Sequence, residues 1–226
     1  EAGENAPELP DGWIKQLSDE SELPMTSIWP NGPRSNAIKI KVPLGDSTDT
    51  DSFTEVEIRA RRRMMQVLDF YRNHKGENWM LDHCSPVIGI REGRRVIGEY
   101  ILTVDDLRAG KKFDDAIAKG VFYLDGHNPG DDKRTYILPK DELKVPPYQI
   151  PLRSLIAKDA TNLLAAGRCL SADQLALSSA RVMTTCAMTG QAAGITAAQA
   201  AANNIDIKEV NALKIRNELE NKGAIL

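Results

Sequence analysis

The last third of the chain joins a short apolar run, a glycine and a long stretch of small residues, and this order constrains the fold more than any other feature. The apolar residues Leu163–Ala166 are followed by Gly167. Such a run, bounded by glycine, predicts a buried strand that ends where a backbone can approach a ligand closely. A helix should follow, with Ser178 or Ser179 as its N-cap, because either hydroxyl can accept from the first free N–H groups.

The predicted helix carries glycine and alanine at three- and four-residue spacing. Gly190, Ala193, Gly194 and Ala197 fall on one face of it. A face without bulky side chains lets another backbone or a planar ring lie against it. It would also suit a core helix that packs tightly on a sheet, so the pattern alone leaves both interpretations open.

Four segments, in order along the chain, resemble one flavoprotein family. They are residues 85–110 (SPVIGIREGRRVIGEYILTVDDLRAG), 122–130 (FYLDGHNPG), 148–156 (YQIPLRSLI) and the small-residue region 162–202. Together they resemble the C-terminal part of the FAD-dependent oxidoreductases that include xanthan-lyase-like proteins, within the glutathione-reductase-type folds. The resemblance implies an oxidoreductase activity and FAD as the cofactor of the intact protein.

One motif of such flavoproteins does not occur in the sequence. They hold the FAD pyrophosphate with a strand, a G-x-G-x-x-G turn and the N-terminus of a helix, and these 226 residues contain no G-x-G-x-x-G. The chain also begins with Glu1 rather than Met. We therefore expect the C-terminal portion of a two-domain flavoprotein, which lacks the N-terminal Rossmann unit and is not competent alone.

Period-two and helical patterns alternate and predict an α+β fold, with a mixed or antiparallel sheet and flanking helices. We divide the chain into a loop-rich lead-in (1–35), a substrate or cap-like domain (36–160), a flavin-contacting strand and helix (161–204) and a C-terminal helix (205–226). Helices are expected at 54–73 and 179–203, with short helical turns at 105–107 and 113–119 and an amphipathic helix within 206–226. Strands are expected at 37–42, 87–90, 96–102 and 122–124, and a charged surface excursion at 131–144.

Charge and cysteine content argue against several classes of function. The net charge is −3 and the pI is near 5.7, so no broad basic surface favours nucleic acid. The alanine-rich region is interrupted by Thr and Gln and lacks the roughly twenty strongly apolar residues of a membrane span. Three cysteines and three histidines are scattered, which predicts no disulfide framework and no metal site. Each cysteine is expected to be a small buried hydrophobe.

Arginines in the segment between the predicted strands 87–90 and 96–102 are candidates for substrate binding. Arg91 and Arg94 could hold an anionic substrate group or offset negative charge on a reduced flavin. Structural ion pairing is the alternative for both, and it is the favoured interpretation for Arg95. The acidic partners that the sequence offers nearby are Glu92, Glu99 and Asp105.

A histidine and a tyrosine complete the candidate catalytic groups. His127 lies in the turn after residues 122–124 and could transfer a proton near neutral pH, or it could stabilise the turn by a hydrogen bond. Tyr148 and Arg153 resemble the family's Y-x-I-P-x-R element, which implies a place near the flavin ring. Tyr148 could equally be a corner residue with a satisfied hydroxyl.

The resemblance also implies which residues contact the cofactor. Related flavoproteins place glycine followed by an acidic residue at the ribityl chain, where this chain has Gly167 and Arg168. The backbone N–H groups of the following helix start would meet the pyrimidine side of the ring, and the positive end of the helix would favour its anionic reduced form. The full set of candidate cofactor-binding residues is Gly167, Arg168, Ser179, Ala180, Arg181, Val182 and Gln191.

Two other classes of function stay open on the sequence alone. Scattered Trp and Tyr residues would suit a carbohydrate-binding or carbohydrate-processing module, although the aromatic content of 5% is low for stacking surfaces. A noncatalytic interaction domain is the other alternative. The expected partners are a small-molecule substrate, which could be carbohydrate-derived, and the missing dinucleotide-binding half, with neither nucleic acid nor membrane. The compartment is left open by the sequence.

Overall fold

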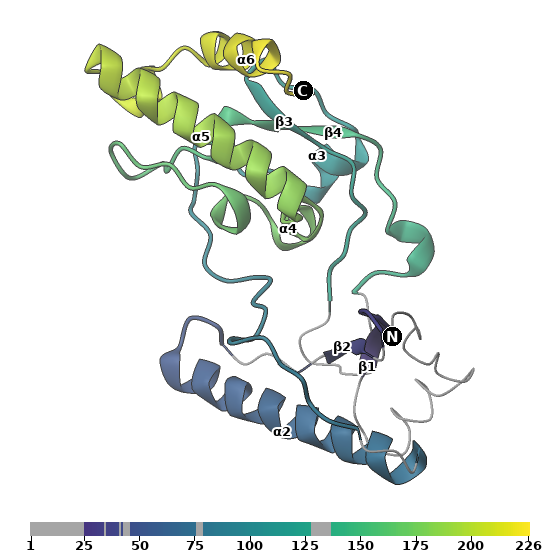
Figure 1. The fold of residues 1–226 in the computed structure, drawn as a ribbon. Helices are drawn as coiled ribbons and strands as arrows, with labels where there is room; N and C mark the ends of the chain where they lie inside the picture. The colour runs from purple at the N-terminus through teal and green to yellow at the C-terminus, as the bar shows by residue number, and fades with distance from the viewer. Residues whose placement is uncertain (1–24, 34, 41, 43–45, 76–78, 128–136) are drawn as a thin grey trace. The chain divides into compact units, whose positions relative to one another are not determined.

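The computed structural model describes residues 25–33, 35–40, 42, 46–75, 79–127 and 137–226 (Figure 1). The chain divides into two compact units, one formed by residues 1–90 with 128–135 and the other by residues 91–127 with 136–226. Each combines helix with one antiparallel strand pair, which confirms the α+β class. Predicted features at residues 1–24 and 131–136 lie outside the described residues, and the division into four segments stays a prediction.

The described residues of the first unit form a β-hairpin and a long helix. Strand β1 (Met25–Pro30) pairs antiparallel with β2 (Asn36–Ile40). The alternating pattern at 37–42 therefore predicted β2, whereas β1 lies in a segment that was expected to be loop. Gly32, between the strands, has a φ of +128°, a conformation that glycine adopts readily and that lets the chain turn.

Helix α2 (Thr50–Lys75) confirms the helix expected at 54–73 and is longer at both ends. The Asp49 carboxylate accepts a hydrogen bond from the Ser52 backbone N–H at 2.8 Å, which satisfies one N–H group of the first turn. Arg61 pairs with Glu57 one turn away at 2.9 Å, so one face of the helix carries an ion pair. The opposite face is buried in a small cluster formed by Val67, Phe70 and Tyr71.

The second unit is a two-stranded antiparallel sheet covered by helices (Figure 1). Strand β3 (Ala116–Gly120) pairs with β4 (Tyr148–Pro151). Helices α5 (Met183–Asn203) and α6 (Ala212–Asn221) contact β3, whereas α3 (Val104–Arg108) contacts β4. The largest fully buried side chains of this core include Leu102, Ile117, Leu124, Ile150, Leu155, Leu177 and Ile215.

The closest packing in this core lies between the two strands. Gly120 is opposite Tyr148, and a Cβ at position 120 would lie 2.2 Å from Cζ of the tyrosine ring. Only glycine leaves room for the ring there. The ring is thereby held in the core, where its hydroxyl bonds to the Ser179 hydroxyl at 2.7 Å.

The helix expected at 179–203 is interrupted and its main part begins later. Helix α4 (Gln174–Ala180) is separated from α5 by Arg181 and Val182. The Asp173 carboxylate caps α4 by accepting from the Ala176 N–H at 2.7 Å, so the prediction that Ser178 or Ser179 is an N-cap was wrong. Both serines are buried within α4. The N-cap of α5 is Val182, which offers no side-chain acceptor to the first turn.

The segment before Gly167 is not the buried strand that was expected. Leu164 makes one isolated bridge with Ile156, and Leu163 is 48% exposed. Gly167 has a φ of +64° and begins a 3-10 turn, Gly167–Cys169. Its N–H donates to Thr189 Oγ1 at 3.0 Å. The glycine is indeed a turning point of the backbone, but it joins the turn to α5 rather than ending a strand.

Several short elements were also predicted wrongly. The segments 87–90, 96–102 and 122–124 form no regular strand, and 96–102 makes isolated bridges through Gly98 and Leu102. A Cβ at Gly98 would lie 2.8 Å from Cβ of Ser171, so close backbone approach, not a sheet, holds this segment. Residues 113–119 were expected to be helical, but most of them belong to β3, because burial of Ala116–Ala118 decides their conformation. The short helix at 105–107 is confirmed as α3, with a Thr103–Asp106 capping box.

Candidate functional site

A charged cluster in the second unit gathers residues from three segments. Arg91 and Glu92 begin the unit, Asp125 and His127 lie in the loop after β3, and Arg181 lies between α4 and α5. Sequence reasoning had singled out four of these five residues and had missed Asp125. We call this group the Asp125 cluster.

Asp125 is the common acceptor of the cluster. Its carboxylate pairs with the Arg91 guanidinium and hydrogen-bonds to His127 Nε2, the latter at 2.9 Å. Its backbone carbonyl accepts from Nη2 of Arg91 at 3.2 Å and from Nη2 of Arg181 at 2.6 Å. The loop after β3 therefore fixes two guanidinium groups and one imidazole around a single residue.

Arg181 is the buried member of the cluster. Its side chain is 6% exposed and pairs with the Glu92 carboxylate, which is 29% exposed. Burial and the neighbouring Arg91 lower the pKa of Arg181, while Glu92 and Asp125 oppose that shift. A guanidinium keeps its proton in proteins even so. A fixed positive charge thus lies directly before Val182, the N-cap of α5.

The sequence left two interpretations open for Arg91 and His127. Arg91 forms an ion pair, as in the structural alternative, but its partner is Asp125 rather than the nearby acidic residues that were expected. His127 hydrogen-bonds to Asp125, which fits a turn-stabilising role. Both side chains stay partly exposed, at 37% and 19%. They are therefore positioned by the fold and still reachable, and their catalytic roles stay predictions.

Tyr148 lies inside the core. It is fully buried, and burial raises the pKa of its hydroxyl to about 12, although the hydrogen bond with Ser179 opposes that shift. Ser179 in turn donates to the carbonyl of Phe122. These contacts favour the alternative of a satisfied structural hydroxyl. Arg153 of the same element pairs with Asp115 at 2.9 Å and lies over the Tyr100 ring.

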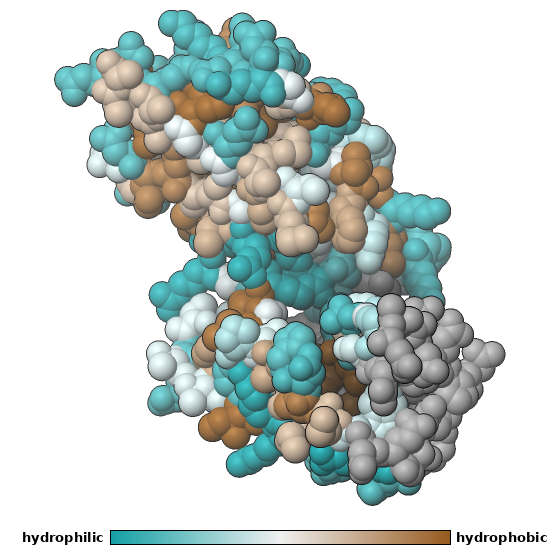
Figure 2. All heavy atoms as spheres, viewed as in Figure 1, coloured by the Kyte–Doolittle hydropathy of each residue, from teal (hydrophilic) through white to brown (hydrophobic). Residues whose placement is uncertain are grey.

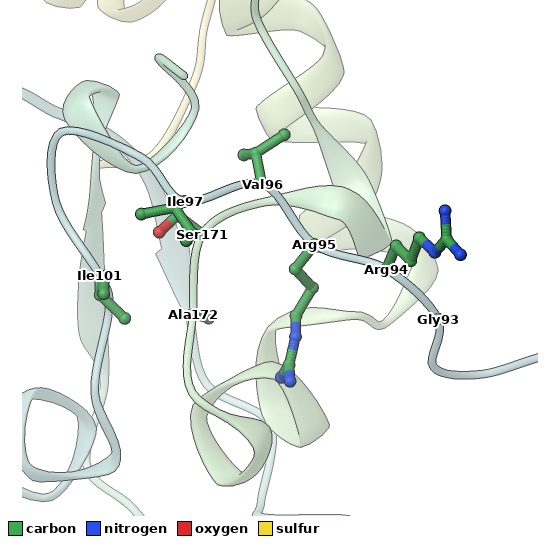
Figure 3. Close-up of a pocket in the computed structure, with 8 residues that line it drawn as sticks. All are labelled: Gly93, Arg94, Arg95, Val96, Ile97, Ile101, Ser171 and Ala172. Atoms are coloured by element: carbon green, nitrogen blue, oxygen red, sulfur yellow. The ribbon is translucent and has the colours of Figure 1, made fainter. Parts of the chain in front are cut away.

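Arg94 and Arg95 line a pocket of about 330 Å³ (Figure 3). The pocket is lined by residues 93–97 with Ile101, Ser171 and Ala172. The ion pairing expected for Arg95 is not found among the residues that the structure describes. Two of its expected partners are engaged elsewhere, Glu92 with Arg181 and Glu99 with Lys208.

The candidate cofactor-binding residues fall into two groups. Ser179 and Ala180 are fully buried in the last turn of α4, which corrects their placement at a helix start. Gly167, Val182 and the exposed Arg168 lie around the beginning of α5, where the Gly167 N–H reaches Thr189. Met183, the first residue of α5, was not among the candidates from the sequence, and it is 89% exposed.

One face of α5 is open and made of small residues. Gln191 lies on this face, and a Cβ built at Gly190 or Gly194 would meet nothing within 4 Å in the described part of the chain. Figure 2 shows the surface over α5 mainly in the tan and white of residues with intermediate hydropathy. The opposite face is buried and carries Thr185, Thr189, Ala192, Thr196 and Ala200. The glycines therefore do not serve packing within the described part of the second unit.

The cysteines only partly follow the expectation that each is buried. Cys84 and Cys169 are exposed, and Cys186 is half-buried. Burial raises the pKa of the Cys186 thiol, against the effect of Arg168, and the thiol donates to the Arg181 carbonyl at 3.3 Å. A thiol held in its protonated form is a poor nucleophile. Cys186 therefore acts as a structural contact between α5 and Arg181.

Comparison with known proteins identifies the family. A family model described as FAD dependent oxidoreductase matches residues 5–219. No curated protein and no solved structure matches the chain significantly. Within the described residues, no helix is long and apolar enough to cross a membrane, and no three metal-ligating side chains gather in one place. Because the family match covers nearly the whole chain, the protein belongs to the FAD-dependent oxidoreductases, and FAD is its cofactor.

Proposed function

We propose that this chain is the C-terminal part of an FAD-dependent oxidoreductase and supplies contacts to the substrate and to the isoalloxazine ring. The observation that carries the proposal is the position of the Asp125 cluster directly before the uncapped start of α5. Arg181 belongs to the cluster, and Val182 follows it as the N-cap without a side-chain acceptor. Fixed cationic groups and free backbone donors thus lie next to each other in sequence and in space.

The residues present fit one end of the cofactor. The first turn of a helix as long as α5 carries N–H groups without intrahelical acceptors, and its positive potential suits the electron-rich pyrimidine oxygens of the ring. Gly167 has no side chain, and its φ of +64° is one that glycine adopts readily. For the pyrophosphate, the sequence offers no G-x-G-x-x-G turn. The fit therefore concerns the ring side alone.

Within this proposal the side chains have separate tasks. When bound, FAD takes up the electrons that leave the substrate. Arg91 orients an anionic group of the substrate, because its guanidinium is held by Asp125 and stays partly exposed. His127 exchanges a proton with the substrate, with Asp125 fixing its ring. Arg94 assists from the adjoining segment, while Tyr148 and Ser179 support the core beneath the cluster.

The open face of α5 suits a second polypeptide surface. Gly190 and Gly194 leave space above the helix, so another backbone can approach closely there. We assign this face to the dinucleotide-binding half of a longer chain. The isolated chain is then incompetent, because the strongest anion-binding site for FAD lies in that half. We assign the chain to the xanthan-lyase-like branch, with a carbohydrate-derived substrate, on the resemblance of the four segments together.

Replacing Arg91 tests the substrate-side role in the flavin-bearing protein. Arg91→Ala should keep full flavin content and slow flavin reduction by substrate about tenfold or more, since a positioning group acts at the reacting centre. Arg216→Ala is the matched control, because it also removes an ion-paired arginine, but from its contact with Glu220 in α6. Flavin absorbance per protein and stopped-flow reduction rates give the two readouts. Parental reduction rates in Arg91→Ala would remove the proposed role.

A further inference from the structure

The pocket at Arg94 and Arg95 is built from two chain segments that are fixed to each other. The Val96 N–H donates to the Cys169 carbonyl at 3.0 Å, and the Leu102 N–H donates to the Ser171 carbonyl at 3.1 Å. Gly98, between them, approaches Ser171 so closely that a Cβ would not fit. Hydrogen bonds at both ends therefore hold the walls in place before any ligand arrives. The pocket has a volume of about 330 Å³ and opens widely to solvent.

The pocket lining is cationic at one side and apolar at the other. Ile97 and Ile101 are 65% and 49% exposed, which leaves two branched apolar side chains in water beside the guanidinium groups. Figure 3 shows Arg94 and Arg95 extending in different directions, with Ile97 and Ile101 on the side away from Arg94. Both arginines and both isoleucines line the pocket.

Arg95 keeps its hydrogen-bonding capacity for a ligand. The nearby carboxylates of Glu92 and Glu99 pair with Arg181 and Lys208. Among the residues that the structure describes, Arg95 forms no ion pair and no hydrogen bond. A guanidinium matches the two oxygens of a carboxylate through paired N–H donors.

We propose that this pocket binds a small organic carboxylate, with its anionic group on Arg95 and its apolar body against Ile97 and Ile101. The one positive charge of the Arg95 guanidinium balances the one negative charge of a carboxylate. The apolar side chains of Ile97 and Ile101 suit a ligand with an aromatic or branched aliphatic body. The site goes beyond the flavin-side role of the Asp125 cluster. Its occupancy does not require flavin, so it can fail or hold independently of the proposed oxidoreductase role.

The test is an NMR titration of the full chain with benzoate, benzamide and inorganic phosphate. Benzoate should cause saturable shifts of the Val96, Ile97 and Ala172 amides. Benzamide keeps the ring but lacks the charge, so it loses the charge-assisted hydrogen bond. Phosphate keeps the charge but lacks the apolar body, so it loses the burial of apolar surface. Each should bind at least about tenfold more weakly than benzoate. Equal binding of benzamide or phosphate overturns the proposal, as does the absence of saturable shifts with benzoate.

Variants locate the anion contact. Arg95→Gln should weaken benzoate binding about tenfold or more, and Arg95→Lys should lie between it and the parent, because the ammonium keeps the charge but loses the paired donors. Arg108→Gln is the matched control, since Arg108 is an exposed cation on α3 with its own partner, Glu142. Unchanged affinity in both Arg95 variants, or an equal loss in Arg108→Gln, overturns the assignment.

Discussion

At the scale of single residues, the second unit depends on one close contact between a glycine and an aromatic ring. Gly120 lies opposite Tyr148 in the β3–β4 pair, and the ring occupies the space that a side chain at position 120 would need. The tyrosine hydroxyl then reaches Ser179 of α4. A strand pair is thereby tied to the helix that leads into the Asp125 cluster.

Gly120→Ala should destabilise the protein by about 1–3 kcal/mol, the usual range for overpacking a core. Gly190→Ala is the matched control, because a Cβ there meets nothing within 4 Å in the described part of the chain. Alanine is the better helix former, so the control should gain up to about 1 kcal/mol. Urea unfolding followed by circular dichroism measures both free energies. A neutral Gly120→Ala would mean that the ring moves aside without cost.

Tyr148→Phe should remove a pH-dependent part of the stability. Because burial raises the folded-state pKa of Tyr148 from 10.0 to about 12, the folded state keeps the phenolic proton longer than the unfolded state does. The stabilisation is fully present below pH 10 and is lost as the pH rises toward 12. At neutral pH the variant should be about 1 kcal/mol less stable, the value of one hydrogen bond, since Ser179 still donates to the Phe122 carbonyl.

Urea unfolding of the parent and of Tyr148→Phe, at neutral pH and then through the range from pH 10.0 to about 12, checks this expectation. The difference in unfolding free energy should shrink and then change sign across that range. A difference that stays constant with pH would show that the Tyr148 hydroxyl titrates as it does in the unfolded chain.

At the scale of elements, one carboxylate serves the beginnings of two helices. Oδ1 of Asp173 accepts from the Ala176 N–H in α4 at 2.7 Å, and Oδ2 accepts from the Val104 N–H in α3 at 2.7 Å. The two helices are far apart in sequence and are joined by this side chain. Asp173 thus fixes where α4 begins.

Asp173→Ala should therefore cost about 2 kcal/mol, since it removes the cap of α4, typically worth about 1 kcal/mol, and the hydrogen bond to the Val104 N–H at the start of α3, worth about as much. Asn211→Ala is the comparison, because Asn211 caps α6 alone through the Leu213 and Lys214 N–H groups, and it should cost about half as much. Thermal unfolding of both variants measures the difference. Equal losses in the two would show that the Val104 contact contributes nothing.

Elements with their own capping signals were predictable from the sequence. Helix α2 and the capping box of α3 follow from local residues. The predictions for 96–102 and 113–119 were wrong for a different reason, because contacts with distant residues determine the conformation of these apolar segments. Gly98 packs against Ser171, and Ala116–Ala118 are buried in the core. The break before α5 was missed for the same reason, since Asp173, not Ser178, provides the cap.

At the scale of the whole molecule, the residue types of the site were predictable but their grouping was not. Arg91, Arg181 and His127 were candidates from their chemistry and from the family resemblance. Only the fold shows that Asp125 holds all three, because it comes from a loop more than thirty residues from Arg91. Tyr148 shows the converse, since its motif implied a place near the ring and the fold places it in the core.

The two ends of the cofactor also place different demands on the molecule. In the proposed function, the start of α5 and the Asp125 cluster serve the ring through N–H donors and positive charge, whereas the pyrophosphate is held by a glycine-rich turn at a helix N-terminus. A chain with only the first feature should gain little from the adenine and phosphate part of FAD. That separation is the central claim of the proposed function.

Equilibrium dialysis of the 226-residue chain against FAD and against lumiflavin, which lacks the ribityl and adenine dinucleotide portions, tests this claim most directly. We expect weak, substoichiometric binding of both ligands, with FAD bound no more than about tenfold more tightly, because no pyrophosphate site adds its binding energy. The contrary result is stoichiometric binding of FAD at micromolar or lower concentration while lumiflavin stays unbound. It would show that the main FAD-binding site lies within this chain.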